Sequence, residues 1–257
     1  MHPILLKIGP LRIASYGTML AIAFAVGILL ARREARRLKM DAERVTDLGL
    51  VVLVCSVVLA RLLYVLLHWD YFTGHLGEIL QVWTGGLSFH GGLAGALLGG
   101  AVYARVSKIG FWRLTEVCTP SGPLGYAIAR IGCLLNGCCY GGPTSLPWGV
   151  AFPISADRPE LTAPSHPAQL YASGLNLILF AVIMRLRWRP HKDGQLFAWY
   201  VVGYSVTRII MEYFRRGVTA RVLWGGVTEA QWASAVIILM GVALSVWLGR
   251  RGKTRKA

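Results

Sequence analysis

The sequence lacks the short motifs of several common enzyme classes. It contains no P-loop, no H-E-x-x-H and no G-x-S-x-G, so nothing marks it as a P-loop nucleotide-binding protein, a zinc protease or an α/β-hydrolase. Charged residues are also scarce, at 15% of the chain, against 55% hydrophobic residues. Together with a mean hydropathy of +0.53, this composition excludes an ordinary soluble domain and indicates an integral membrane protein.

A cleavable signal peptide is also missing, because the first hydrophobic run has neither a basic leader nor a small-residue cleavage site. We expect this run to stay as the first membrane span. Seven hydrophobic runs come close to the roughly 20 residues that cross a bilayer. They predict spans near residues 14–31, 48–67, 87–106, 114–135, 170–184, 196–214 and 232–248, in a single membrane domain covering residues 1–257.

The net charge of +15 does not indicate a nucleic-acid partner, because the basic residues are unevenly distributed between alternate loops. Most Lys and Arg residues follow the first, third, fifth and seventh runs, including the basic tail at 250–257. By the positive-inside rule, this bias places the N-terminus outside and the C-terminus in the cytoplasm. We therefore predict an all-α membrane protein with seven transmembrane helices and a small periplasmic cap at 136–167.

Three arginines interrupt the hydrophobic runs: Arg61, Arg130 and Arg208. A charge at the centre of a span costs about 2.5–3.5 kcal/mol on the most lenient scale, so it commonly marks a functional site. Counting at 1.5 Å per residue from the cytoplasmic charges puts the three arginines, Tyr16 and His90 at one level, about 22–25 Å from that edge. The sequence thus predicts a polar site in the outer leaflet.

A phosphate is the natural partner of such arginines, since guanidinium binds it bidentately and keeps its charge away from water. Glu212, four residues after Arg208, shares its helix face and can orient it through an ion pair. His90 lies among glycines that would let a substrate approach its ring, which suits a proton acceptor. Each of these residues also has a structural alternative. The arginines can extend their charged ends to the membrane interface, the ion pair can serve only to stabilise its helix, and the histidine can form a hydrogen bond within the helix bundle.

Five cysteines are present, of which Cys55 and Cys118 lie in hydrophobic runs and suit packing. Cys133, Cys138 and Cys139 fall near the predicted outer face, where a disulfide can form. Metal binding is less well supported, because no second pair with zinc-ligand spacing occurs.

At these residues the chain resembles the prolipoprotein diacylglyceryl transferase family, bacterial inner-membrane enzymes with seven spans. The most specific segments are Ser88-Phe89-His90-Gly91-Gly92 and the block 130–141. Other matching segments follow in the same order along most of the chain: His2-Pro3, Tyr16-Gly17, Arg61-Leu62-Leu63-Tyr64, Trp148-Gly149, His166-Pro167-Ala168-Gln169-Leu170-Tyr171, Arg208, Glu212, Phe214 and Arg215.

The resemblance implies transfer of the diacylglyceryl group of phosphatidylglycerol to the lipobox cysteine of a prelipoprotein. The product would be a thioether, and glycerol-1-phosphate would leave. The implied partners are phosphatidylglycerol, the prelipoprotein signal peptide and membrane lipids, without nucleic acid, metal or organic cofactor. The implied site residues are Arg130 and Arg208 on the lipid headgroup, with Tyr16, His90, Asn136 and Gly141 also essential.

The chain departs from the family pattern at Cys133, where members carry Asn, and at Cys138, where they carry an acidic residue. This departure puts in doubt a mechanism that uses a carboxylate at that position as the base. Two other functions stay open from the residues alone. One is a channel or transporter for an anionic solute lined by Arg61, Arg130 and Arg208, and the other is a thiol-redox enzyme built on the outer cysteines.

Overall fold

The computed structural model describes residues 1–8, 11–82, 85–155, 158–215, 222 and 226–251. The chain is mostly helical and forms two compact units. The first unit comprises Met1–Ala31 and Cys118–Ala257, and the second comprises Arg32–Val117. A single membrane domain stays a prediction.

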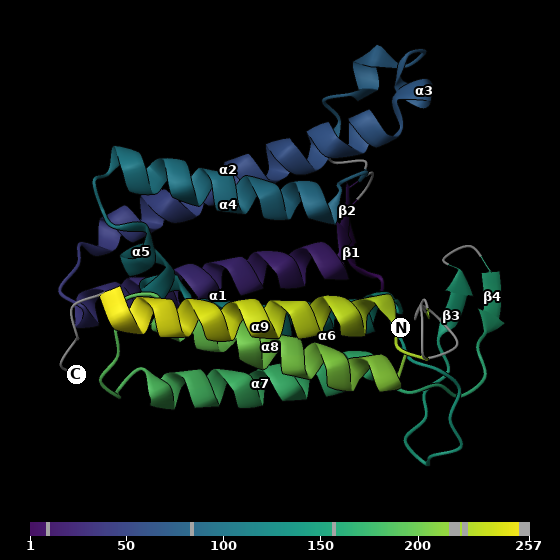
Figure 1. Ribbon diagram of the computed structural model, residues 1–257. Coiled ribbons are helices and arrows are strands. Elements are labelled where there is room, and N and C mark those ends of the chain that lie inside the picture. The colour runs from purple at the N-terminus through teal and green to yellow at the C-terminus, as the bar shows by residue number, and fades with distance from the viewer. Residues whose placement is uncertain (9–10, 83–84, 156–157, 216–221, 223–225, 252–257) are drawn as a thin grey trace. The chain divides into compact units, whose positions relative to one another are not determined.

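The first unit is a set of long helices that pack in chain order. Its helices are α1 (Ser15–Arg37, which continues into the second unit), α6 (Ser121–Asn136), α7 (Ala168–Leu186), α8 (Gln195–Tyr213) and α9 (Glu229–Arg251). Helix α6 packs against α7, α7 against α8 and α8 against α9 (Figure 1). Glycine permits one of these close contacts, because a Cβ on Gly203 of α8 would lie 2.4 Å from the Leu179 side chain of α7.

Two small hairpins accompany these helices. Strands β1 (Ile4–Ile8) and β2 (Leu11–Ala14) pair antiparallel directly before α1, a feature that the sequence analysis did not predict. Strands β3 (Pro153–Ser155) and β4 (Arg158–Leu161) pair antiparallel within the predicted cap. The cap has a core of its own, in which the fully buried Phe152 stacks on Tyr140 with ring centroids 4.9 Å apart.

The second unit is built on two helices in close contact, α2 (Ala42–Leu67) and α4 (Phe89–Val106) (Figure 1). Added Cβ atoms on Gly91 and Gly95 of α4 would lie only 2.3 Å from backbone carbonyl oxygens of α2. The glycine-rich sequence is therefore explained by backbone packing. The short helices α3 (Trp69–Phe72) and η1 (Leu76–Glu78) lie in the connection between α2 and α4, and α5 (Phe111–Cys118) follows α4.

The predicted span near residues 114–135 does not form one continuous helix. The structure has two helices there, because α5 ends at Cys118 and α6 begins at Ser121. Pro120 stands between them, and proline removes a backbone donor and disfavours helical conformation in the residue before it. Helix α6 is left with 16 residues, about 24 Å at the α-helical rise.

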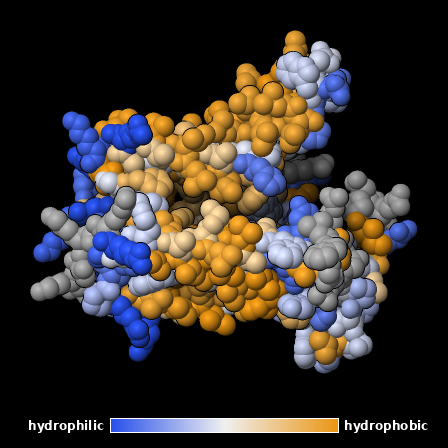
Figure 2. All heavy atoms as spheres, in the orientation of Figure 1, coloured by the Kyte–Doolittle hydropathy of each residue, from blue (hydrophilic) through white to orange (hydrophobic). Residues whose placement is uncertain are grey.

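Four of the described helices are long and apolar enough to cross a membrane: α1, α2, α7 and α9. In the first unit, hydrophobic side chains cover α8 and α9 on the face that Figure 2 shows. These findings fit an all-α membrane protein, while seven spans and their orientation stay predictions. Residues 216–221 and 223–225, and residues 252–257 of the basic tail, lie outside the described residues.

Candidate functional site

Arg130 lies on α6, half-buried, six residues before the end of the helix. Its Nη2 donates to the hydroxyl of Tyr126 at 2.5 Å, and its guanidinium lies over the Tyr126 ring, 4.6 Å from the centroid. Its Nη1 makes a weak contact of 3.9 Å with the Cys133 sulfur. These contacts use two of five N–H groups and involve no carboxylate, so the cation keeps donors for an anion.

Arg208 lies on α8, five residues before the last residue of the helix, Tyr213. It forms the expected ion pair with Glu212, four residues further along the helix. The Glu212 side chain is 3% exposed and that of Arg208 is 28% exposed. The buried carboxylate thus fixes one edge of the guanidinium, and the partly exposed remainder can reach a ligand.

Two tyrosines connect Arg130 and Arg208. The rings of Tyr126 and Tyr204 meet edge to face with centroids 5.5 Å apart, which joins α6 to α8. The hydroxyl of Tyr204 lies within electrostatic reach of both guanidinium groups. Arg130 and Arg208 therefore belong to one polar cluster of the first unit, here called the arginine patch, which also includes Tyr126 and Tyr204.

Tyr16 reaches the same patch from α1. A Cβ on Gly132 of α6 would lie 2.9 Å from the Met19 side chain and 3.4 Å from Tyr16 Cα. Because glycine lets α1 approach α6 this closely, Tyr16 interacts electrostatically with Arg130 and Cys133. The residue as a whole is 41% exposed, so its side chain is only partly covered by the fold.

Asn136 and Gly141 belong to the turn that leaves α6. Asn136 is the last residue of the helix and is exposed, and Gly137 ends the helix in the left-handed conformation with φ of 77°. Gly141 is buried, and its N–H donates to the carbonyl oxygen of His166 at 2.9 Å. An added Cβ there would lie 2.4 Å from the Phe214 carbonyl oxygen. Gly141 therefore holds the turn against the end of α8 through its backbone.

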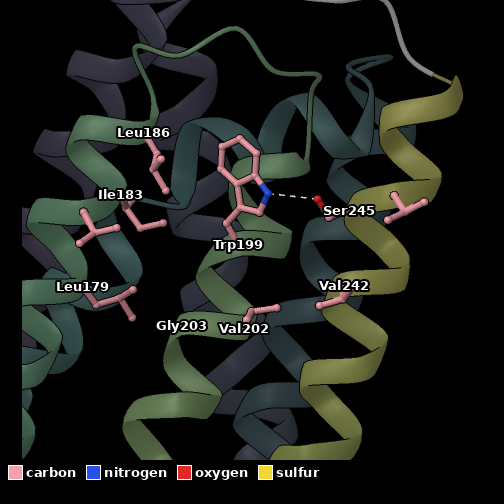
Figure 3. A pocket seen from close by; sticks show the side chains of 10 residues that line it. Leu179, Ile183, Leu186, Trp199, Val202, Gly203, Val242 and Ser245 are labelled. Carbon is pink, nitrogen blue, oxygen red and sulfur yellow. Dashed lines mark hydrogen bonds between the residues drawn. The ribbon is translucent and has the colours of Figure 1, made fainter.

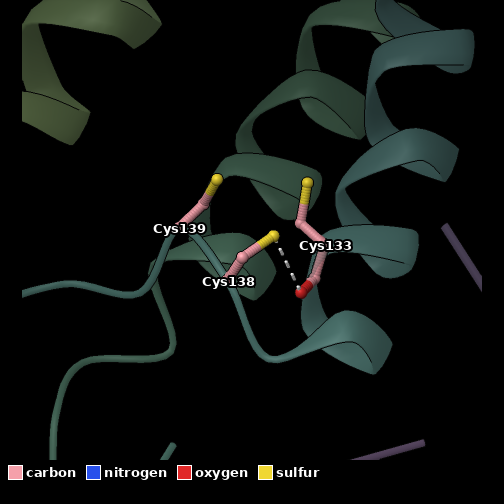
Figure 4. Close-up of side chains that lie close together, drawn as sticks. All are labelled: Cys133, Cys138 and Cys139. Carbon is pink, nitrogen blue, oxygen red and sulfur yellow. Dashed lines mark hydrogen bonds between the residues drawn. The ribbon is translucent and has the colours of Figure 1, made fainter. Parts of the chain in front are cut away.

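Three cysteines come together where α6 ends: Cys133 lies on the helix, and Cys138 and Cys139 lie in the turn that follows (Figure 4). The sulfur atoms of Cys133, Cys138 and Cys139 all lie within 4.8 Å of one another, and all three thiols are free. Hydrogen bonds from the thiols of Cys133 and Cys138, with the positive charges of Arg130 and Arg215, lower the pKa of the Cys139 thiol below its usual range. The sequence analysis placed these residues near the outer face but did not predict one cluster.

Arg61, in the second unit, has different surroundings. Its side chain is buried and donates to four backbone oxygens, at 2.6–3.0 Å, and its guanidinium also lies near the rings of Tyr64 and Phe72. The four acceptors are the carbonyls of Glu78, Ile79, Gly85 and Gly86. Four of five N–H groups are thus used within the fold, which favours a structural role over the predicted substrate contact.

We expect Arg61→Met to destabilise the second unit by about 3 kcal/mol, since hydrogen bonds to charged groups contribute about 1.5–3 kcal/mol each and four carbonyls would lose their donor. The measurement is thermal unfolding in detergent, with proteolysis of the segment 78–86. The exposed Arg105 of α4 supplies the control, Arg105→Met. Unchanged stability with lost activity would show instead that Arg61 contacts substrate.

His90 is the second residue of α4 and its side chain is exposed. The Gly91 next to it packs against α2, so the start of α4 is held firmly. The ring meets Phe89 edge to face at 5.8 Å. The histidine is therefore accessible on a fixed backbone, and its expected role in proton transfer stays a prediction.

An apolar groove lies between α7, α8 and α9 of the first unit, with a volume of about 340 Å³ (Figure 3). Leu179 and Ile183 line one side, Val242 lines the other, and Trp199 Nε1 donates to Ser245 Oγ at 3.0 Å. No charged residue lines it. The groove suits hydrocarbon and not a phosphate, so it is distinct from the arginine patch.

The sequence analysis missed Tyr126 and Tyr204. Each stands four residues before an arginine of the site, Arg130 and Arg208 respectively. Residues four apart share a helix face, so this repeated spacing was a usable signal. The spacing is not specific by itself, because aromatic residues near the end of a span are also explained by the interfacial aromatic belt.

Comparison with known proteins identifies the family. The family model described as prolipoprotein diacylglyceryl transferase matches residues 3–247. A protein of Geobacillus kaustophilus named phosphatidylglycerol–prolipoprotein diacylglyceryl transferase is 37% identical, covering 97% of this chain and 93% of its own length. Proteins of the same name from Synechococcus elongatus (38% identical, 96% and 87% covered) and Thermosynechococcus vestitus (34%, 94% and 89%) agree. The chain belongs to the prolipoprotein diacylglyceryl transferase family.

Proposed function

We propose that this protein transfers the diacylglyceryl group of phosphatidylglycerol to the lipobox cysteine thiol of prelipoproteins. A thioether forms and glycerol-1-phosphate leaves. The observation that carries the proposal is the pair of arginines, Arg130 and Arg208, on two helices joined by the ring contact of Tyr126 and Tyr204 in a chain of this family. Nothing in the described residues or in the names of the relatives favours the transporter alternative.

In this proposal Arg130 and Arg208 bind the lipid phosphate and stabilise the charge that develops on the leaving oxygen. Fixed cations act most strongly where charge appears in the transition state. Glu212 orients Arg208, and Tyr16 contacts the headgroup or the leaving oxygen from α1. Asn136 and Gly141 shape the turn that borders the site, and Arg61 supports the second unit.

His90 is proposed to accept or relay the proton of the incoming thiol. An imidazole changes protonation near neutral pH, and its exposed ring on the fixed start of α4 is accessible to substrate. A thiol reacts as its thiolate, so a proton acceptor is needed.

The proposed setting is the bacterial inner membrane, crossed seven times, with the N-terminus outside and the C-terminus in the cytoplasm. The excess of Lys and Arg in alternate loops supports this orientation. The arginine patch and the cap at 136–167 would then lie on the periplasmic side, where lipobox cysteines arrive with their signal peptides.

The test uses purified protein in vesicles, phosphatidylglycerol labelled in its acyl chains, and a peptide with a lipobox cysteine. We expect label to move to the peptide and glycerol-1-phosphate to appear in equal amount. A peptide with serine in place of that cysteine, and vesicles of phosphatidylcholine alone, are the controls. Solute flux through the vesicles without covalent transfer would reject the proposal.

A further inference from the structure

The three outer cysteines have no role in the function proposed above, yet their sulfur atoms converge. Cys133 is the last buried residue of α6, while Cys138 and Cys139 lie in the turn that follows (Figure 4). All three sulfurs lie within 4.8 Å of one another. Cys133 is buried, Cys138 is half-buried and Cys139 is exposed, so the cluster is supported on one side and open on another.

The backbone holds this arrangement in place. The N–H of Cys138 donates to the Cys133 carbonyl oxygen at 3.1 Å. The buried Gln169 of α7 donates from Nε2 to the Cys138 carbonyl oxygen at 2.7 Å. Cys139 adopts the left-handed conformation with φ of 63°, which is uncommon outside glycine, asparagine and aspartate and is kept only where the surroundings enforce it.

Three convergent thiols are suited to a soft metal ion. Zinc bonds to cysteine sulfur at about 2.3 Å, so sulfurs on a tetrahedral zinc lie about 3.8 Å apart. Sulfurs within 4.8 Å reach that geometry by small side-chain rotations. Three thiolates and one Zn²⁺ carry a net charge of −1, and the guanidinium of Arg130, 3.9 Å from the Cys133 sulfur, balances it.

We propose that Cys133, Cys138 and Cys139 bind a zinc ion, and that the open fourth position of this zinc takes the thiol of the acceptor peptide. The second half of this inference rests on the function proposed above. Catalytic zinc sites have three protein ligands and one open position, whereas structural sites have four protein ligands. Within the described residues the cluster has three cysteines, and the exposed Cys139 leaves it accessible on one side.

The chemistry balances without an oxidant or a reductant. The acceptor thiol binds zinc as its thiolate, and the proton passes to a base or to bulk water. The sulfur electron pair then forms the bond to the glycerol carbon. The carbon–oxygen bond to the phosphate breaks, and its electron pair stays on the oxygen of the departing glycerol-1-phosphate. Zinc remains Zn²⁺ throughout.

The first experiment measures zinc by mass spectrometry in protein purified without chelators. We expect about one zinc per chain in the wild-type protein. In Cys133→Ser and Cys139→Ser we expect the amount of bound zinc to fall by about tenfold or more. Cys118→Ala, in the same unit, is the matched control and keeps its zinc. Wild-type protein that binds no zinc, binds only copper, or holds two of the three cysteines in a disulfide overturns the proposal, even where lipid transfer is intact.

The second experiment needs no variant. Cobalt(II) replaces zinc in the wild-type protein, and its sulfur-to-metal absorption reports the number of thiolate ligands. A lipobox peptide with cysteine should strengthen this absorption, and the serine peptide should not. An unchanged spectrum overturns the open-position role. Thiolate binding by cobalt without any lipid transfer by the zinc protein would overturn the proposed function and leave the zinc site supported.

Discussion

Arg130→Ala lowers the rate of lipid transfer by about 10²–10³-fold, the loss expected when one fixed donor to developing charge is removed. Arg130 is half-buried, and its hydrogen bonds among the described residues, to Tyr126 and Cys133, use two of its five N–H groups. Arg130→Lys keeps the charge but loses bidentate geometry, so we expect it to recover only part of the rate. Single-turnover transfer from labelled phosphatidylglycerol measures the effect.

The exposed Arg105 of α4 provides a matched control, because Arg105→Ala removes an arginine outside the patch. It should transfer at the wild-type rate. Because Tyr126 donates no charge but positions Arg130, Tyr126→Phe should lose less than Arg130→Ala. Transfer by Arg130→Ala at the wild-type rate would contradict the site.

Arg208→Ala is expected to reduce both activity and stability, since it leaves Glu212 buried without its partner. Breaking a buried ion pair costs about 3–5 kcal/mol, and we expect about 3 kcal/mol because Arg208 keeps some contact with solvent. The side chains of Glu212 and Arg208 are 3% and 28% exposed. Thermal unfolding in detergent and the transfer assay measure the two effects separately.

The double variant Arg208→Met with Glu212→Gln separates these two roles. Neutral residues of similar size remove the unpaired charge, so stability should return close to that of the wild type. Activity should stay low, because the phosphate has still lost a cation. If the double variant regains transfer together with stability, Arg208 is a structural residue and not a phosphate ligand.

The pattern of hydrophobic residues along the chain was sufficient to predict the positions of most helices. Hydrophobic length predicted most helices to within a few residues, as for α7 over Ala168–Leu186 against the expected 170–184. It failed at Pro120, where one hydrophobic run forms two helices. It also failed at the hairpin of β1 and β2, because a short apolar run before a membrane span carries no distinct strand signal.

The candidate site was predictable where its residues share a helix. Arg208 and Glu212, four positions apart, form the expected ion pair. The three cysteines were visible in sequence, but spacing alone does not say which sulfurs meet. Their convergence depends on the left-handed backbone at Gly137 and Cys139 and on the hydrogen bond from Gln169 of another helix.

The sequence by itself determined that this protein is a helical membrane protein and, through its motifs, which family it belongs to. Both depend on features that are local along the chain: hydrophobic length and short runs of residues. Only the tertiary structure separated Arg61, enclosed by four carbonyls from 17 to 25 residues away, from Arg130, which keeps free donors. A guanidinium binds the acceptors that the fold brings close to it. When these acceptors are backbone oxygens far away along the chain, the residues next to the arginine in the sequence do not reveal them.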